Sequence, residues 1–455
     1  DQLDAIPYLK PAADSEEARY FAARRQALGG YVPARHAAVQ ALQIPELSAF
    51  ATQLKDTGDR AISTTMAFVR ILGTLLKDPH LGKLVVPIVP DESRTFGMES
   101  LFRQIGIHSA VGQLYTPQDA GQLSYYKESK DGQIMQEGLN ESGAISSWIA
   151  ASTSYSNHGL MTVPFYIFYS MFGFQRVGDL AWAAGDARAR GFLLGATAGR
   201  TTLMGEGLQH DDGHSHILSS VIPCCVSYDP TFAYELAVII REGMRRMYVE
   251  QEDIYYYITL LNENYPHPAM PDGVEDGILK GMYRLSGDPK AQVQLMGSGS
   301  ILREVIAAAA LLAEDFGVQS AVWSVTSLTE LRRDGHAVER WNLLHPDSEP
   351  RVSYVEQCLQ AHTGPVVVAT DYMKLFADQI RPFVPARRFV ALGTDGFGQS
   401  DTRETLRAFF EVDRHFIALA ALKALADDGV IGRDKVSEAI KRYGINVDKV
   451  DPVAV

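Results

Sequence analysis

Two adjacent carboxylates, Asp91 and Glu92, follow a short apolar run at residues 84–89 that predicts a buried strand. Open α/β sheets bind their ligands at the carboxyl ends of parallel strands. Neighbouring carboxylates also repel each other, which suits a group that picks up and releases a proton. The pattern predicts a proton-transfer site after this strand. A solvated loop is the alternative that the residues alone leave open.

Glu141 is a further candidate acid. It follows Asn140 at the start of a predicted helix over residues 141–154. Asn140 is a favourable N-cap, and the helix dipole favours a negative charge in the first turn, so a purely structural role explains Glu141 from spacing alone. A catalytic carboxyl group at the end of the helix is the alternative hypothesis.

An aromatic and cationic group follows at Tyr169, Phe172 and Arg176, spaced i, i+3 and i+7. If this stretch is helical, the three side chains share one face and the rings could stack on a flat ligand. Aromatic residues at this spacing more often belong to a hydrophobic core. Both interpretations are compatible with the sequence.

Three histidines, His210, His214 and His216, occur close together in an acidic, glycine-containing segment. Zinc sites use histidine, but no further ligands occur here at a recognisable zinc spacing. We therefore expect a polar loop rather than a metal site.

Residues 112–127 also predict a polar loop, and loops of this length are usually functional or disordered. The turn at residues 297–300 lacks the third glycine of a dinucleotide-binding motif, so we do not expect nicotinamide binding.

The composition is that of a globular protein with more than one domain: 455 residues, 46% hydrophobic and 21% charged. A net charge of −13 argues against nucleic acid as the main partner. The apolar runs are too short to cross a membrane, and the three cysteines form neither a disulfide framework nor a zinc motif. We expect a cytoplasmic protein with no membrane or nucleic-acid partner.

Predicted strands alternate with helices along the chain, which indicates an α/β fold of two domains whose mostly parallel sheets are covered by helices. In the first domain we predict strands at 84–89, 191–197, 221–227 and 254–260 and helices at 64–76, 141–154, 175–184 and 232–249. In the second we predict strands at 293–296, 320–325, 366–369 and 389–392, with helices at 301–316 and 372–381. The boundaries we expect are a connector at 1–43, domains at 44–265 and 291–455, and a proline-rich linker at 266–290.

Five motifs, taken together and in order, resemble the homodimeric, bacterial-type pyruvate dehydrogenase first component. They lie at residues 90–99, 136–141, 168–176, 205–210 and 392–398 and read PDESRTFGME, QEGLNE, FYSMFGFQR, GEGLQH and LGTDGFG. The resemblance implies a pyrimidine-binding domain, a transketolase-like C-terminal domain, and an upstream domain outside this sequence that binds the diphosphate of thiamine diphosphate. The Gly-Asp-Gly motif with which that family binds Mg²⁺ does not occur here, so we expect the Mg²⁺ ligands in the upstream domain.

The resemblance also implies roles for the candidate residues. Glu141 would be the acid beside the aminopyrimidine ring, favouring the tautomer that activates the cofactor. Tyr169 and Phe172 would line the ring pocket, with Arg176 orienting Glu141 or a neighbour. Near the substrate the family places His210 with Glu206 behind it, and Glu92 with Asp91 beside it. A loop that orders over the site would contain Tyr115, Asp119, Tyr126 and Lys127.

The function implied by this resemblance is decarboxylation of pyruvate followed by reductive acetylation of a lipoyl group. The implied partners are a second copy of the chain and the dihydrolipoyl acetyltransferase component with its lipoyl domains. Three alternatives remain: another 2-oxo acid dehydrogenase, a transketolase-like enzyme, and an inactive dimerisation module. Without the diphosphate-binding domain, we expect the chain alone to be inactive.

Overall fold

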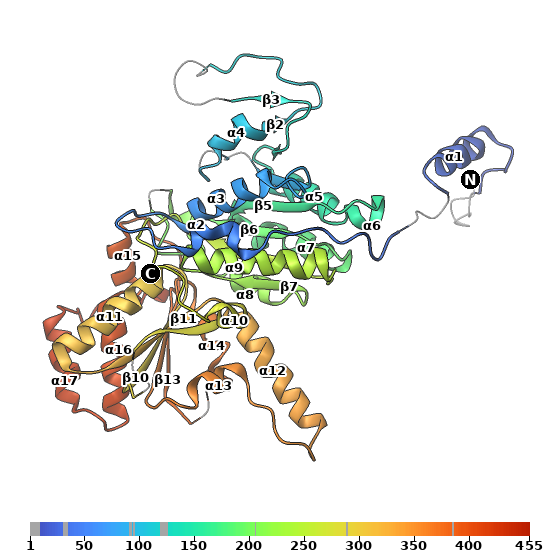
Figure 1. The fold of residues 1–455 in the computed structure, drawn as a ribbon. Coiled ribbons are helices and arrows are strands. Elements are labelled where there is room, and N and C mark those ends of the chain that lie inside the picture. The colour runs from blue at the N-terminus through green and yellow to red at the C-terminus, as the bar shows by residue number, and fades with distance from the viewer. Residues whose placement is uncertain are drawn as a thin grey trace, which may run out of the picture.

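The computed structural model describes residues 10–30, 35–90, 93, 96–118, 126–204, 206–287, 290–384 and 386–455. Two large β-sheets, of six and five strands, follow one another along the chain, each with helices on both faces (Figure 1). The helix α1 (Glu16–Ala27) contains no buried residue and lies apart from both sheets (Figure 1). None of the helices in the described ranges combines the length and hydropathy needed to span a bilayer.

The first sheet has six strands in the order β4-β1-β5-β6-β8-β7, and every neighbouring pair is parallel. Its strands are β1 (Val85–Val89), β4 (Met135–Gln136), β5 (Val163–Tyr169), β6 (Phe192–Ala196), β7 (Cys225–Tyr228) and β8 (Tyr255–Leu260). A parallel sheet needs crossover helices, and these bury both of its faces. The strands are accordingly apolar along most of their length.

Side chains of β5 alternate between two helical layers. Phe165 and Ile167 pack on the side of α3 (Thr64–Lys77) and α9 (Ala233–Met244), whereas Tyr166 and Phe168 pack on the side of α5 (Glu141–Ser152) and α7 (Phe174–Asp186). This alternation follows from the two-residue repeat of a β-strand. It fixes α5 and α7 beside each other on one face of the sheet.

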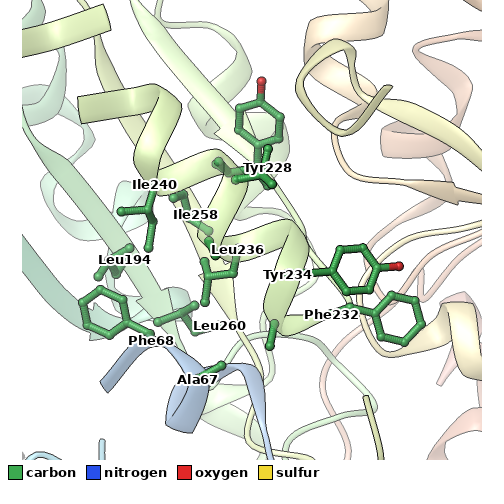
Figure 2. Close-up of a cluster of buried hydrophobic side chains, with 14 of the residues drawn as sticks. Ala67, Phe68, Leu194, Tyr228, Phe232, Tyr234, Leu236, Ile240, Ile258 and Leu260 are labelled. Carbon is green, nitrogen blue, oxygen red and sulfur yellow. The ribbon is translucent and has the colours of Figure 1, made fainter. Parts of the chain in front are cut away.

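Figure 2 shows the core on the α3 and α9 side of this sheet. Phe68 of α3 and Leu236 and Ile240 of α9 meet Leu194 of β6 and Ile258 of β8, and all five side chains are fully buried. Burying one such side chain contributes about 1.5–3 kcal/mol. The core therefore holds the sheet rigid beneath the loops at its carboxyl edge.

The second sheet has the order β13-β12-β10-β11-β9, with β9 antiparallel to β11 and the other pairs parallel. Its strands are β9 (Met282–Ser286), β10 (Val293–Gly297), β11 (Ser320–Val325), β12 (Val366–Ala369) and β13 (Phe389–Leu392). Helices α11 (Ile301–Phe316) and α16 (Arg414–Asp427) pack on one face, while α12 (Leu328–Leu344), α13 (Tyr354–Leu359) and α14 (Lys374–Asp378) cover the other.

Shorter elements complete the described structure. A lobe above the first sheet contains α4 (Glu99–Ile105), β2 (Ile107–His108) and β3 (Glu128–Ser129) (Figure 1). The remaining helices include α2 (Ala51–Leu54), α6 (Ser154–His158), α8 (Ser215–Ser220), α10 (Glu275–Lys280), α15 (Arg403–Phe409) and α17 (Arg433–Arg442). Short 3-10 helices include η3 (Ser170–Phe172) and η4 (Leu208–His210), and α9 continues into the π-helical turn η5 (Arg245–Val249).

A buried carboxylate joins the two sheets. Glu235, the third residue of α9, accepts hydrogen bonds from the backbone N–H groups of Thr231 and Phe232 at 2.6 and 2.9 Å. From the second sheet, Tyr283 of β9 and Ser324 of β11 each donate a hydroxyl hydrogen bond to it at 2.6 Å. Burial raises the pKa of Glu235, and these four donors oppose the rise. The two sheets therefore share one polar network and pack as neighbours.

Most predicted elements are confirmed, including β1, β6, β8, β10 to β13, α3, α5, α7 and α11. The strand predicted at 221–227 begins only at Cys225, because α8 and its cap extend to Val221. The helix predicted at 372–381 is reduced to α14. Residues 266–290, predicted as a linker, contain α10 and β9, and β9 forms the edge of the second sheet.

Candidate active site

Glu141 is the first residue of α5. The side chain of Asn140 caps this helix by accepting a hydrogen bond from Gly143 N at 3.0 Å, as the sequence predicts. A Cβ atom at Gly143 would lie 2.6 Å from Asn140 Nδ2, so glycine leaves room for the cap. Because the cap fixes the first turn, the direction in which Glu141 leaves the helix is also fixed.

The Glu141 carboxylate pairs with Arg176. Nη1 of Arg176 lies 2.9 Å from Oε1 of Glu141, and the two side chains are 48% and 19% exposed. The same guanidinium lies over the ring of Phe172, with Cζ 3.8 Å from the ring centroid. Arg176 therefore connects the acid to the aromatic group.

Tyr169, Phe172 and Arg176 do not lie on one helical face, so the helical arrangement considered for them is wrong. Tyr169 ends β5, Phe172 ends η3, and Arg176 lies in the first turn of α7. The extended, apolar run of β5 overrides the helical spacing, since a central parallel strand must be buried on both faces. The chain nevertheless brings the ring centroids of Tyr169 and Phe172 to 6.1 Å.

His210 completes this cluster. Its ring centroid lies 4.7 Å from that of Tyr169 and 4.9 Å from that of Phe172. Nδ1 lies 2.8 Å from the backbone carbonyl oxygen of Glu206. Because a carbonyl oxygen can only accept, Nδ1 carries a proton, and Nε2 of the neutral ring is an acceptor. Glu206 thus contacts His210 through its main chain.

The other two histidines of this segment point elsewhere. His214 Nε2 lies 3.0 Å from Gln175 Oε1. His216 is fully buried between the hydroxyl groups of Ser227 and Thr259 at 3.0 and 2.9 Å, and burial lowers its pKa to about 3. Within the described ranges, no group of three or more His, Cys, Asp or Glu side chains is arranged to bind a metal ion.

Asp91 and Glu92 lie outside the described residues, but the end of β1 can be located. Ser93 Oγ donates a hydrogen bond to Gln136 Oε1 at 3.1 Å, and Glu137 N donates to Val89 O at 3.1 Å. Val89, at the end of β1, and Ser93 are therefore adjacent to β4 and to the motif that ends at Glu141.

One member of the cluster was not among the residues predicted for the site. The ring of Phe96 lies 5.5 Å from that of Tyr169. Close to Glu141 in the sequence, the carboxylate of Glu137 accepts a hydrogen bond from Ser147 of α5 at 2.5 Å. Both residues belong to the motifs that carry the resemblance. Phe96 belongs to no periodic apolar pattern, so only the motif could have identified it.

The expected mobile loop is described at both ends. Tyr115 and Tyr126 both donate hydroxyl hydrogen bonds to Glu128 Oε1, at 2.9 and 2.8 Å. Burial and this bond raise the pKa of Tyr126. Lys127 is exposed and accepts a backbone hydrogen bond from Ile107 at 2.9 Å, while Asp119 lies outside the described residues. The two ends of the loop are therefore tied together at the lobe.

Two family models match the chain. Residues 42–268 match the model described as "Pyruvate dehydrogenase E1 component middle domain", and residues 281–413 match "Transketolase-like TK C-terminal domain". The first range contains the six-stranded sheet with the cluster around Glu141, and the second contains the five-stranded sheet.

Relatives with curated descriptions are similar along the whole chain. The pyruvate dehydrogenase E1 component of Cupriavidus necator is 62% identical over 460 residues, which cover 100% of this chain and 51% of that protein. The corresponding component of Escherichia coli K12 is 57% identical over 454 residues, which cover 99% of this chain and 51% of that protein. This chain therefore spans about half the length of these relatives.

Solved structures show the same fold at low sequence identity. Transketolase from Leishmania mexicana matches with a TM-score of 0.61 and 16% identity, over 84% of this chain and 49% of that chain. A structure described as "Split gene transketolase, inactive beta4 tetramer" matches with a TM-score of 0.54 and 15% identity, over 80% of this chain and 98% of that chain. The fold is transketolase-like, and the two family models together with the relatives show that the chain belongs to the pyruvate dehydrogenase E1 component family.

Proposed function

We propose that this chain supplies the pyrimidine-binding half of an active site that uses thiamine diphosphate and Mg²⁺ to decarboxylate pyruvate. The observation that carries the proposal is the cluster of Glu141, Arg176, Phe172, Tyr169 and His210 at the carboxyl edge of the first sheet. This is the edge at which α/β sheets bind ligands. Membership of the E1 family supports the choice of reaction.

The residues fit an aminopyrimidine ring. Such a ring needs a carboxyl group at one nitrogen and apolar surface against its face. Glu141 offers a partly exposed carboxylate, while Tyr169 and Phe172 offer partly exposed rings next to it. One face of Phe172 is covered by Arg176, so a planar group would use the remaining aromatic surface. When bound, thiamine diphosphate supplies the carbon nucleophile and the electron sink that decarboxylation of a 2-oxo acid requires.

The chain's own groups then hold and orient protons. Glu141 would share a proton with the ring nitrogen of the bound cofactor, and Arg176, which forms an ion pair with Glu141, would fix the orientation of that carboxyl group. Because Nδ1 of His210 is bound to Glu206 O, Nε2 is the nitrogen that we propose faces the substrate. We propose that His210 lies near the carboxylate or the carbonyl oxygen of the substrate. Asp91 and Glu92 are proposed to lie near the substrate, and the segment containing Tyr115, Asp119, Tyr126 and Lys127 is proposed to close over it.

We propose that a further domain holds the diphosphate and the Mg²⁺. The partners expected for an E1 component are also proposals. These partners are a second copy of the chain and an acetyltransferase component whose lipoyl group becomes reductively acetylated. The domain ranges 44–265 and 291–455 and a connector at 1–43 remain proposals. Within the proposed linker at 266–290, β9 pairs with the second sheet and so belongs structurally to the second unit.

The test is reconstitution. The chain is joined to the diphosphate-binding half of an E1 relative, and carbon dioxide release from pyruvate is measured with thiamine diphosphate and Mg²⁺. We expect turnover from the joined protein and none from the chain alone. Calorimetry tests whether the diphosphate and Mg²⁺ are held by a further domain. Micromolar, magnesium-dependent binding of the cofactor by the chain alone would contradict that proposal. Absence of turnover from a folded, dimeric joined protein would contradict the function.

A second candidate is an assembly module without activity of its own. The split gene transketolase chain matches this chain over 98% of its length, and its description calls the tetramer inactive. A unit with these two sheets therefore occurs elsewhere as a separate chain. Turnover of the joined protein separates the two candidates. Sedimentation of the chain alone does not, because both predict association, but a monomer at tens of micromolar would contradict both.

A further inference from the structure

A loop from the second sheet packs against the turn that carries His210. This loop, residues 393–399, follows β13. Nη1 of Arg200, which comes from the first α/β unit, donates hydrogen bonds to the carbonyl of Thr394 at 2.6 Å and to that of Gly396. Arg200 is only 5% exposed, so these bonds are shielded from water. The loop is therefore held against the first unit.

Gly398 makes the closest approach. A Cβ atom at this position would lie 2.5 Å from Leu208 O and 2.7 Å from Asp211 Cβ. Leu208 begins η4, and Asp211 follows its last residue, His210. No side chain fits at residue 398 unless the loop and the turn move apart, so the position of η4 depends on the second α/β unit.

Asp211 forms the direct link across this contact. Its Oδ2 accepts a hydrogen bond from the backbone N–H of Gln399 at 3.1 Å, and its own N–H donates to Leu208 O at 3.2 Å. The residue is only 3% exposed, so its carboxyl group is shielded from solvent. Its covalent neighbour His210 is the residue that faces the aromatic cluster. A shift of Asp211 must therefore move the imidazole.

The carboxyl group is costly to bury at this position. Burial is the main reason that the pKa of Asp211 is raised to about 7. The Gln399 N–H and the Arg200 guanidinium oppose the rise, whereas Asp371 and Glu206 add to it. An asparagine would accept the same hydrogen bond without a buried charge. The Asp211 side chain therefore contributes an acceptor oxygen in a fixed place rather than a charge. This supports a role in positioning its neighbours.

We propose that Asp211 is a positioning residue for His210, and that its hydrogen bond with Gln399 lets the C-terminal unit set the orientation of the imidazole. The proposal rests on the role proposed above for His210. In this proposal the second unit helps to shape the active site but contributes no group to the reaction. Asp211 and Gly398, on opposite sides of the contact, should then give the same result when changed.

The test uses four variants. Asp211→Ala removes the acceptor, Gly398→Ala pushes from the other side, Asp211→Asn keeps the acceptor, and Ser400→Ala changes an exposed neighbour as the control. In the chain labelled with ¹⁵N-histidine, imidazole shifts report which nitrogen of His210 is protonated, with His210→Gln for assignment. We expect Asp211→Ala and Gly398→Ala to lose the Nδ1–H form, and Asp211→Asn and Ser400→Ala to keep it.

Turnover of the reconstituted enzyme provides a second measurement. Misplacing a catalytic group slightly lowers turnover steeply, so we expect Asp211→Ala and Gly398→Ala to lower kcat about 10-fold and Asp211→Asn to restore most of it. If Asp211→Ala does not fold, Gly398→Ala decides. An unchanged His210 protonation pattern in these two variants would overturn the proposal. If His210→Gln leaves turnover unchanged, the role proposed for His210 in the reaction is wrong. The protonation pattern of His210 in the Asp211 and Gly398 variants then still tests whether the contact orients the imidazole.

Discussion

Arg176 Nη1 lies 2.9 Å from Oε1 of Glu141, and this ion pair joins the first turn of α7 to the first residue of α5. With Arg176 half exposed, solvent screens the pair, and exposed pairs contribute about 1 kcal/mol or less to stability. The guanidinium also covers Phe172. The pair therefore contributes little to stability, and we propose that its role is to orient Glu141.

Replacing Glu141 by Gln tests the acid itself. Glutamine keeps the size and hydrogen-bonding capacity of the side chain but cannot exchange a proton with a ring nitrogen. General acid–base groups contribute about 10² to 10⁴-fold, and we expect a loss of kcat in this range in the reconstituted enzyme. The fold should survive. Exchange of the thiazolium proton, followed by NMR at saturating cofactor, measures the step directly, and a normal exchange rate would remove Glu141 from the mechanism.

Arg176→Ala should act only through Glu141. We expect it to lower kcat about 10-fold, because the carboxyl group loses its orientation, and to change the free energy of unfolding by about 1 kcal/mol or less. Residues that act as a unit are not additive. The double variant Glu141→Gln/Arg176→Ala should therefore turn over no more slowly than Glu141→Gln alone. Multiplied effects would instead mean that Arg176 contacts the substrate or cofactor independently.

Much of the fold could be predicted from residue patterns because strands and helices in α/β units have clear boundaries. The helix α11 was predicted with its observed limits, Ile301–Phe316, since it begins after a strand and ends at Gly317 in a left-handed conformation. The central strand β5 was missed. Its second residue is Pro164, which normally argues against a central strand, and here proline is tolerated near the start of the strand.

The candidate site was less predictable from patterns alone. Glu141, Tyr169 and His210 come from a helix start, a strand end and a 3-10 turn, and no spacing rule links positions so far apart in the sequence. The motifs brought them together only through the family resemblance. The contact between Asp211 and Gln399 gave no signal, because it depends on how two α/β units pack. Long-range packing of this kind leaves no periodicity in either segment.

Phe68→Ala tests the core beneath the site. The Phe68 ring is fully buried and lies 5.6 Å from that of Phe165. Removing a buried phenylalanine typically lowers the free energy of unfolding by about 3–5 kcal/mol through lost transfer energy and a residual cavity. Urea unfolding at equilibrium measures this change. Lys77→Ala, at the exposed end of the same helix, is the control and should change it by only a few tenths of a kcal/mol.

The last prediction concerns Asp229, a buried carboxyl group after β7. Its Oδ1 accepts hydrogen bonds from Thr259 at 2.6 Å and Tyr372 at 3.3 Å, and burial raises its pKa to about 7. A folded-state pKa above the unfolded value means that the unfolded state releases the proton first. The stabilising contribution is then complete below about pH 4 and is lost as the pH rises toward 7. Wild-type stability should accordingly fall across this window.

Asp229→Asn keeps the acceptor oxygen and replaces the protonated form by a neutral amide, so it removes this group's share of the pH dependence. The difference in free energy of unfolding between the variant and the wild type should shift in favour of the variant by about 1 to 3 kcal/mol as the pH rises from 5 to 8.5. Asp211, Glu235 and Asp371 also have raised pKa values, so some decline with pH should persist in the variant. Urea midpoints at both pH values measure the difference, with exposed Asp59→Asn as the matched control. Parallel pH profiles for the wild type and Asp229→Asn would mean that Asp229 stays charged in the folded protein, held by its hydroxyl donors against the effect of burial.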